Sequence, residues 1–151
     1  MIPLDNLRYL SAQKVKDAQV LFRYGRNNGA IYLMGYALEF SLKRKISQTF
    51  GFAQGFPETG AELNTYTGRF SRPNTPSTGI PLPTLRQIRH HRLNDLLTYS
   101  GMQPRITASY YPEWLIVANW NPENRYLRTR VTKKRASDFI RAAKLILAEI
   151  S

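Results

Sequence analysis

Two adjacent histidines set among arginines are the residues best suited to chemistry. His90 and His91 are the only histidines in the chain, and Arg86, Arg89 and Arg92 lie within a few positions of them. A histidine that titrates near neutral pH can remove the proton of an RNA 2′-hydroxyl, and an arginine can stabilise the charge that develops on the phosphate. Neighbouring cations favour the neutral imidazole, which suits a general base. The alternative is structural, with His91 capping a helix and His90 solvated.

A second pair with possible chemistry is Glu39 and Lys43, which lie four residues apart in a segment, 29–43, that is apolar on nearly all faces. A helix of this kind must be covered by other helices, so we expect it to be central. An unpaired charge buried there would be very costly. We therefore expect a partly buried pair that reaches Arg125 or Tyr126 across a polar groove. The same spacing also suits an ordinary ion pair on an exposed helix surface.

Six cations follow one another without an intervening acid: Arg125, Arg128, Arg130, Lys133, Lys134 and Arg135. Arginine side chains can bind phosphate oxygens in a bidentate manner, and Tyr126 lies close enough in sequence to stack on a base. We predict that Lys43, Arg125, Tyr126, Arg128, Arg130, Lys133 and Lys134 contact nucleic acid. The alternative is a solvated basic surface.

The formal net charge of +12 and the pI of about 10.3 favour a polyanionic partner. RNA, a nucleotide, DNA, an acidic protein or an anionic membrane would each fit this charge, and the charge could also serve solubility alone. The chain has no cysteine, which excludes disulfides and thiolate metal sites. No metal-ligand spacing and no glycine-rich phosphate loop are visible, so we expect neither a metal nor a cofactor.

The sequence predicts a soluble, cytoplasmic protein without membrane contact. The N-terminal residues show no basic region followed by an apolar run, as a secretory signal would. No apolar stretch approaches the roughly 20 residues needed to cross a bilayer. A chain of 151 residues can bury a core without disulfides, so we expect residues 1–151 to form one domain.

The elements that must position these residues are helices. Apolar positions recur at helical spacing in five segments, and alternating patterns are almost absent. We expect helices over about 5–24, 27–50, 84–100, 113–119 and 132–150. Residues 51–85 hold five of the nine glycines and five of the nine prolines and show no period, which indicates a long irregular loop. The pattern predicts an all-α, up-and-down bundle of about five helices.

With these helices assigned, the chain resembles the HEPN domain family of higher eukaryotes and prokaryotes. Three stretches carry the resemblance, and they occur in the order and spacing of that family. They are similar to its A-x-E-x-x-L-K helix, its H-x-L-x-x-L segment and its W-x-x-x-x-R-Y junction, at residues 37–43, 91–96 and 120–126.

This resemblance implies either a metal-independent RNase or a noncatalytic module that binds RNA, a nucleotide or an acidic protein such as a nucleotidyltransferase. It also implies a homodimer in a toxin–antitoxin or phage-defence setting. The nuclease signature is Arg, four to six residues, then His, and its one match here is Arg86 to His91; no His follows Arg125. The resemblance makes Glu39 the acid that orients a catalytic Arg. The candidate catalytic residues are therefore His91, Arg86, Glu39 and Arg125.

Overall fold

The protein is all-helical in the computed structural model, which describes residues 1–70, 79–126 and 128–151, with side chains at all of these except 68–70. The all-α prediction is confirmed, but the expected count of about five helices is too low. The described residues form eight α-helices and one 3₁₀-helix, η1: α1 Leu4–Arg23, α2 Asn27–Thr49, α3 Gly60–Phe70, α4 Leu85–Ile88, α5 Leu93–Ser100, α6 Gln103–Ser109, α7 Tyr111–Val117, η1 Pro122–Tyr126 and α8 Lys133–Ile150.

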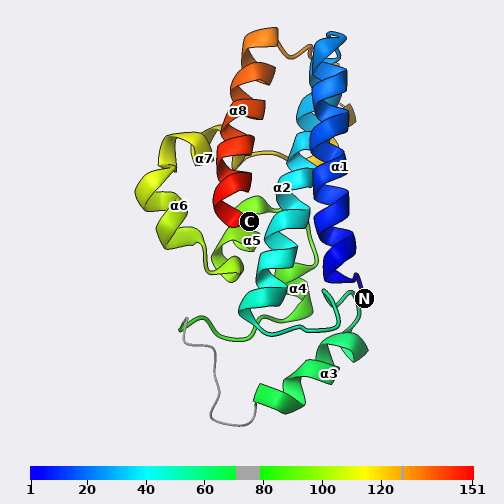
Figure 1. Ribbon diagram of the computed structural model, residues 1–151, viewed down its shortest axis with the longest axis vertical. Helices are drawn as coiled ribbons and strands as arrows, with labels where there is room; N and C mark the ends of the chain where they lie inside the picture. Colours follow the sequence, from blue (N-terminus) through cyan, green and yellow to red (C-terminus); the bar gives the residue numbers. More distant parts are fainter. Residues whose placement is uncertain (71–78, 127) are drawn as a thin grey trace.

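The long helices α1, α2 and α8 lie side by side and form the body of the molecule (Figure 1). Helix α1 runs opposite to α2, whereas α8 runs in the same direction as α2. The simple up-and-down order is therefore wrong, because the short helices between α2 and α8 return the chain to the end where α2 began. No helix of the described residues is long and apolar enough to span a membrane.

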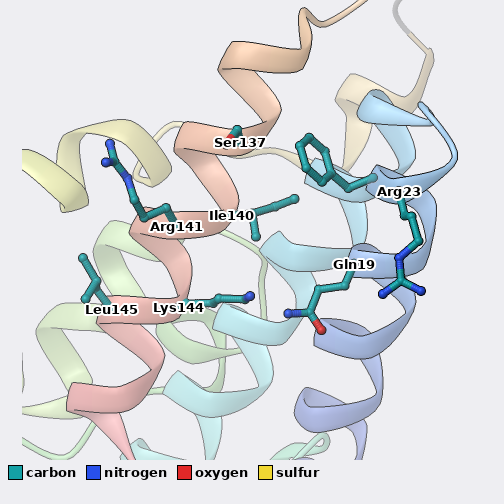
Figure 2. Close-up of a pocket in the computed structure, with 8 residues that line it drawn as sticks. Gln19, Arg23, Ser137, Ile140, Arg141, Lys144 and Leu145 are labelled. Atoms are coloured by element: carbon teal, nitrogen blue, oxygen red, sulfur yellow. The ribbon is translucent and has the colours of Figure 1, made fainter.

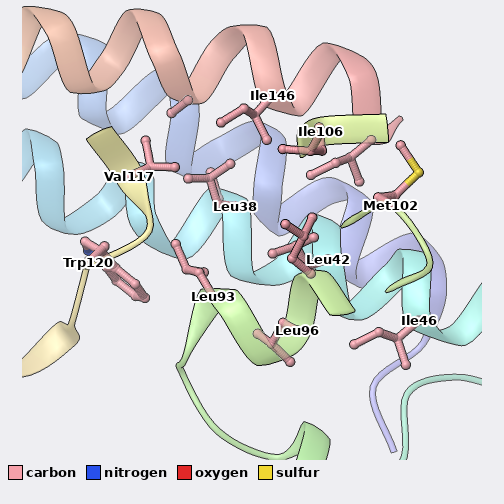
Figure 3. Close-up of a cluster of buried hydrophobic side chains, with 14 of the residues drawn as sticks. Leu38, Leu42, Ile46, Leu93, Leu96, Met102, Ile106, Val117, Trp120 and Ile146 are labelled. Carbon is pink, nitrogen blue, oxygen red and sulfur yellow. The ribbon is translucent and has the colours of Figure 1, made fainter. Parts of the chain in front are cut away.

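Helix α2 is central, as its apolar sequence predicted. It packs against α1, α5, α8 and η1, and its residues Leu38, Leu42 and Ile46 are fully buried. Leucines of α5 and Ile146 of α8 complete this part of the core (Figure 3). Each such side chain contributes about 1.5–3 kcal/mol by its removal from water, so the core fixes the position of every residue that α2 carries.

The prediction of an irregular loop over 51–85 is wrong in part, because α3 lies within it. The aromatic rings of Phe52 and Tyr66 stack at a centroid distance of 4.6 Å, and both are buried. Phe56 is also buried, and its backbone pairs with that of Ile2 in an isolated β-bridge. This half of the segment belongs to the core, while residues 71–78 lie outside the described residues.

The third predicted helix, 84–100, is two helices, α4 and α5, separated by a short connection at Arg89–Arg92. Likewise, the single helix predicted over 113–119 corresponds to α7 and begins earlier, and the preceding helix α6 was missed. Prolines in the first turns of α6 and α7 divide a region that has little apolar period of its own. The start of the last helix at Thr132 is confirmed, since its Oγ1 accepts a hydrogen bond from the Arg135 N–H at 3.2 Å.

Candidate functional site

The two histidines lie in the connection between α4 and α5, where the backbone is held at both ends. Thr84 caps α4 with a reciprocal capping box that involves Gln87, which satisfies backbone groups at the start of this four-residue helix. Ile88 and Leu93, which flank the connection, are both fully buried. The connection is therefore short and anchored, so the histidine side chains project from a defined backbone.

His91 is paired with the buried carboxylate of Glu39. Its Nδ1 lies 2.8 Å from Glu39 Oε2, while Lys43 Nζ lies 2.6 Å from Glu39 Oε1. The two residues of α2 are buried, with 1% of Glu39 and 8% of Lys43 exposed. The prediction of a buried Glu39–Lys43 pair is confirmed, but the pair reaches His91 and not Arg125 or Tyr126.

The pairing determines which nitrogen of His91 can act as a base. An ionised carboxylate only accepts hydrogen bonds, so Nδ1 must donate to Glu39, and in the neutral ring Nε2 then carries the lone pair. The His91 side chain is 52% exposed. A buried carboxylate therefore orients a half-exposed imidazole, which is the arrangement of a general base and its positioning group.

His91 opens onto a cleft with a volume of about 690 Å³. Residues from two parts of the chain line it, namely Arg86–Asp95, except Gln87 and Ile88, on one side and Ala118–Pro122 on the other. Three of the lining side chains are exposed arginines, Arg86, Arg89 and Arg92. Arg92 pairs with Asp95 at 2.9 Å, whereas within the described part of the chain Arg86 and Arg89 form no ion pair. The predicted partners Arg86 and His91 thus share one basic cleft.

His90 has a different environment from that of His91. Its Nδ1 accepts the backbone N–H of Arg92 at 3.1 Å, and its Nε2 lies 3.4 Å from Asp95 Oδ2. Only 16% of the side chain is exposed. Burial, and secondarily the charge of Arg92, lowers the pKa of His90 below its usual value. His90 is therefore held as a neutral, structural side chain, and the solvated state considered for it is not observed.

An aromatic cluster on α2 forms the wall next to His91. The Tyr36 ring lies 5.9 Å from the His91 ring and 5.0 Å from Trp120, measured between centroids, in edge-to-face geometry. Trp120 can reach α2 so closely because residue 35 is glycine, where a Cβ would lie 2.0 Å from Trp120 Cε2. Tyr36 in turn packs on Tyr32, at 5.1 Å. Packing thus fixes the imidazole on its aromatic side as well as through Glu39.

The two tyrosines of this cluster titrate differently. Burial, together with a hydrogen bond to Tyr32, raises the pKa of Tyr36 to about 12. The hydrogen bond with Tyr36, together with the Arg125 guanidinium, lowers the pKa of Tyr32. Tyr36 therefore remains a neutral hydrogen-bond donor near His91, and Tyr32 is the acceptor that holds Arg125.

Arg125 lies at the far end of this cluster and not beside Glu39. Its Nη1 donates to Tyr32 Oη at 2.9 Å, and its Nη2 donates to Tyr126 Oη at 2.6 Å. Trp120 separates this group from the cleft, since it lines both the cleft and a smaller pocket of about 90 Å³ that includes Arg125. The contact predicted between Glu39 and Arg125 is therefore not formed, and Arg125 belongs to a neighbouring site.

The predicted nucleic-acid contacts divide into buried and exposed residues. Lys43 is buried against Glu39, with its Nζ 5.4 Å from the Phe56 ring centroid, so it is not a surface contact. The remaining cations, Arg128, Arg130, Lys133 and Lys134, are exposed. Lys134 pairs with Asp138 at 2.8 Å. Asn28 of α2 holds the basic segment, donating to the Thr129 carbonyl and accepting the Val131 N–H, each at 2.8 Å.

Part of this site could not be found in the sequence. The pairing of Glu39 with His91 joins residues 52 positions apart, and no local pattern signals it. The aromatic stripe Tyr32, Tyr36 and Phe40 was accessible, because its spacing of four residues places the three rings on one face of a helix. In the sequence these rings contributed only to the apolar character of segment 29–43, and no role at a site was predicted for them.

Across the described ranges 1–70, 79–126 and 128–151, no group of three or more His, Cys, Asp or Glu residues lies close enough to hold a metal ion. Comparison of the chain with models of protein families, with curated proteins and with solved structures found no match.

Proposed function

We propose that this protein is a HEPN-like ribonuclease that cleaves RNA without a metal ion and uses His91 as its general base. One observation carries the proposal: the Nδ1 atom of His91 lies 2.8 Å from the buried carboxylate of Glu39, in a cleft that three arginines line. The Arg-x4-His spacing of Arg86 and His91 and the similarity of the chain to HEPN motifs add to it.

In the proposed reaction, His91 Nε2 takes the proton of a ribose 2′-hydroxyl. The 2′-oxygen attacks the adjacent phosphorus, the bond to the 5′-oxygen breaks, and water supplies a proton to that leaving oxygen. The products are a 2′,3′-cyclic phosphate and a 5′-hydroxyl end. Arg86 and Arg89 stabilise the charge on the phosphorane, Glu39 orients the imidazole, and Lys43 compensates the charge of Glu39.

A positioned general base contributes about 10²–10⁴-fold to a rate, which sets the size of the effect to be measured. The purified protein is incubated with a mixed RNA pool in EDTA, beside His91→Asn and Arg86→Ala. Asparagine can still donate to Glu39 but has no basic nitrogen. We expect cleavage by the wild type and a loss of at least about 100-fold in His91→Asn, with an unchanged melting temperature.

Two controls make this test specific. Arg128→Ala removes an exposed cation outside the cleft and should leave the rate at saturating RNA unchanged. The ends of the fragments should carry cyclic phosphate. Equal cleavage by the wild type and His91→Asn would refute the role of His91, and RNA that is bound but never cut would leave a noncatalytic RNA-binding module.

A further inference from the structure

A groove between α1 and α8, separate from the histidine cleft, has no role in the proposed reaction. Its volume is about 790 Å³, and its lining comes from these two helices: Gln19, Phe22, Arg23, Ser137, Ile140, Arg141, Lys144 and Leu145. Ile140 and Lys144 point from α8 toward α1, where Gln19 and Arg23 lie opposite (Figure 2). None of these residues lines the cleft at His91.

The groove combines an apolar floor with a basic rim. Ile140 and Phe22 supply apolar surface between the helices, and Leu145, on the side of α8 away from α1 (Figure 2), extends it with 43% of the residue exposed. Three cations surround this surface, namely Arg23, Arg141 and Lys144, and no carboxylate lines it. Arg141 has only a distant partner, Asp138 at 3.6 Å. Among the ion pairs of the described residues, none involves Arg23 or Lys144.

We propose that this groove binds an acidic amphipathic helix of a partner protein. A groove between two parallel or antiparallel helices accepts a third helix through apolar side chains at positions i, i+4 and i+7. The lining from Ser137 to Leu145 covers about 12 Å of α8 at 1.5 Å per residue, or two turns of the docked helix. Acidic residues beside its apolar face meet the three cations of the rim.

The apolar floor is what favours a helix over RNA in this groove. An RNA strand presents phosphates and aromatic bases and is bound by cations with exposed aromatic rings. This groove offers aliphatic side chains on its floor, with Phe22 half-buried. Burial of a leucine or isoleucine from the partner covers that surface, whereas a phosphate held by the rim cations would leave it exposed to water.

The test uses a fluorescent helical peptide of about 18 residues with leucine at i, i+4 and i+7 and glutamate on both sides of this face. Two control peptides replace either the leucines by serine or the glutamates by lysine. Binding to the full chain is measured by anisotropy. We expect the acidic amphipathic peptide alone to bind, and Lys144→Glu and Arg23→Glu each to weaken it by about tenfold or more, because like charges are then juxtaposed.

Arg128→Glu is the matched control, since it makes the same charge change at an exposed residue outside the groove, and it should bind as the wild type does. The inference is overturned if the acidic peptide does not bind, if the serine peptide binds equally, or if Lys144→Glu binds as tightly as Arg128→Glu. Weaker binding of the peptide to Arg86→Ala/Arg89→Ala than to the wild type would instead place the peptide in the histidine cleft and also overturn it. RNA cleavage by Lys144→Glu should stay at the wild-type rate whether or not the peptide binds. Failure of the peptide-binding proposal can therefore be distinguished from failure of the proposed RNA cleavage.

Discussion

Glu39 accepts hydrogen bonds from one buried and one exposed side chain, and this difference defines its role. Lys43 compensates the charge of Glu39 inside the protein, whereas His91 binds the other carboxylate oxygen and lines the cleft. Removal of the carboxylate charge would leave the Lys43 ammonium buried without a counterion, and a broken buried pair costs about 3–5 kcal/mol. The stability of α2 and the orientation of the imidazole therefore depend on the same carboxylate.

These two roles can be separated by a double substitution. We expect Glu39→Gln to lower the free energy of unfolding by about 3 kcal/mol and to reduce RNA cleavage. Adding Lys43→Met removes the orphaned charge and should restore most of the stability but none of the cleavage. Urea unfolding and a cleavage assay provide the two measurements. Wild-type cleavage by the stable double variant would mean that Glu39 does not position His91.

His90 is expected to make stability depend on pH. Its pKa is lowered in the folded protein by burial and by Arg92, so the unfolded chain binds the proton more tightly. The contribution of His90 is fully present above the unfolded pKa of about 6.5 and is lost as the pH falls toward the lower folded pKa. Melting temperatures between pH 8 and pH 5 should therefore fall more steeply for the wild type than for His90→Asn. Parallel curves would show that His90 is equally titratable in both states.

At the scale of elements, the sequence predicted the three long helices and the short α7, missed α3 and α6, and merged α4 with α5. Helices α1, α2 and α8 have clear apolar patterns and were found with ends correct to within two residues. Helix α3 was missed although Leu63, Tyr66 and Phe70 lie at helical spacing, because the glycines and prolines of 51–85 predicted an irregular loop. The break at Arg89–Arg92 was missed because Leu85, Leu93 and Leu96 fit one helical face even though the backbone between them is interrupted.

The candidate site shows the same limit of local patterns. The structure brings His91 and Arg86, which were selected by residue type and spacing, to one cleft. Glu39, which the resemblance made the partner of an arginine, is buried behind the cleft and pairs with His91. Arg125 was selected by the same reasoning and lies with Tyr32 and Tyr126. Whether His91 or Arg125 meets the buried Glu39 carboxylate depends on how α5 and η1 dock on α2, and that docking is a property of the tertiary packing.

The contact between α2 and Trp120 should be the most sensitive to added volume. A Cβ at Gly35 would lie 2.0 Å from the Trp120 ring, and overpacking costs about 1–3 kcal/mol. This exceeds the gain of about 0.5–1 kcal/mol that alanine normally brings to a helix. We expect Gly35→Ala to lower the melting temperature, to shift the tryptophan fluorescence and to reduce cleavage.

Gly29→Ala is a suitable control on the same helix. The nearest atom to its added Cβ is Leu21 Cδ1, at 3.1 Å, and this is the end of a flexible side chain that can move. Gly29→Ala should therefore keep or slightly raise the melting temperature and leave the fluorescence unchanged. The same response from both variants would contradict the proposed close packing of Trp120 on residue 35.

At the scale of the whole molecule, a net charge of +12 attracts any polyanion, so affinity alone does not locate the RNA site. Three surfaces carry the cations that matter here. The cleft at His91 has Arg86 and Arg89, the segment before α8 has Arg128 and Arg130, and the groove between α1 and α8 has a basic rim. Only the first places its cations beside His91, the proposed general base, so under the proposed function only there should the loss of charge affect the chemical step.

The salt dependence of RNA binding can separate these surfaces. Each phosphate contact contributes about 0.7 to the slope of log affinity against log salt for a single strand, so loss of two contacts should lower the slope by about 1.4. We expect this reduction for the double variant Arg86→Ala/Arg89→Ala, measured by anisotropy with His91→Asn also present to prevent cleavage. With His91 intact, Arg86→Ala/Arg89→Ala should lower the cleavage rate at saturating RNA.

The control is Arg128→Ala/Arg130→Ala, which should lower the salt slope of RNA binding but leave the cleavage rate at saturating RNA unchanged. An unchanged slope for Arg86→Ala/Arg89→Ala would mean that RNA does not enter the cleft. If these two exposed arginines contact phosphates, their removal leaves on the RNA counterions that the wild type releases, so the slope must fall.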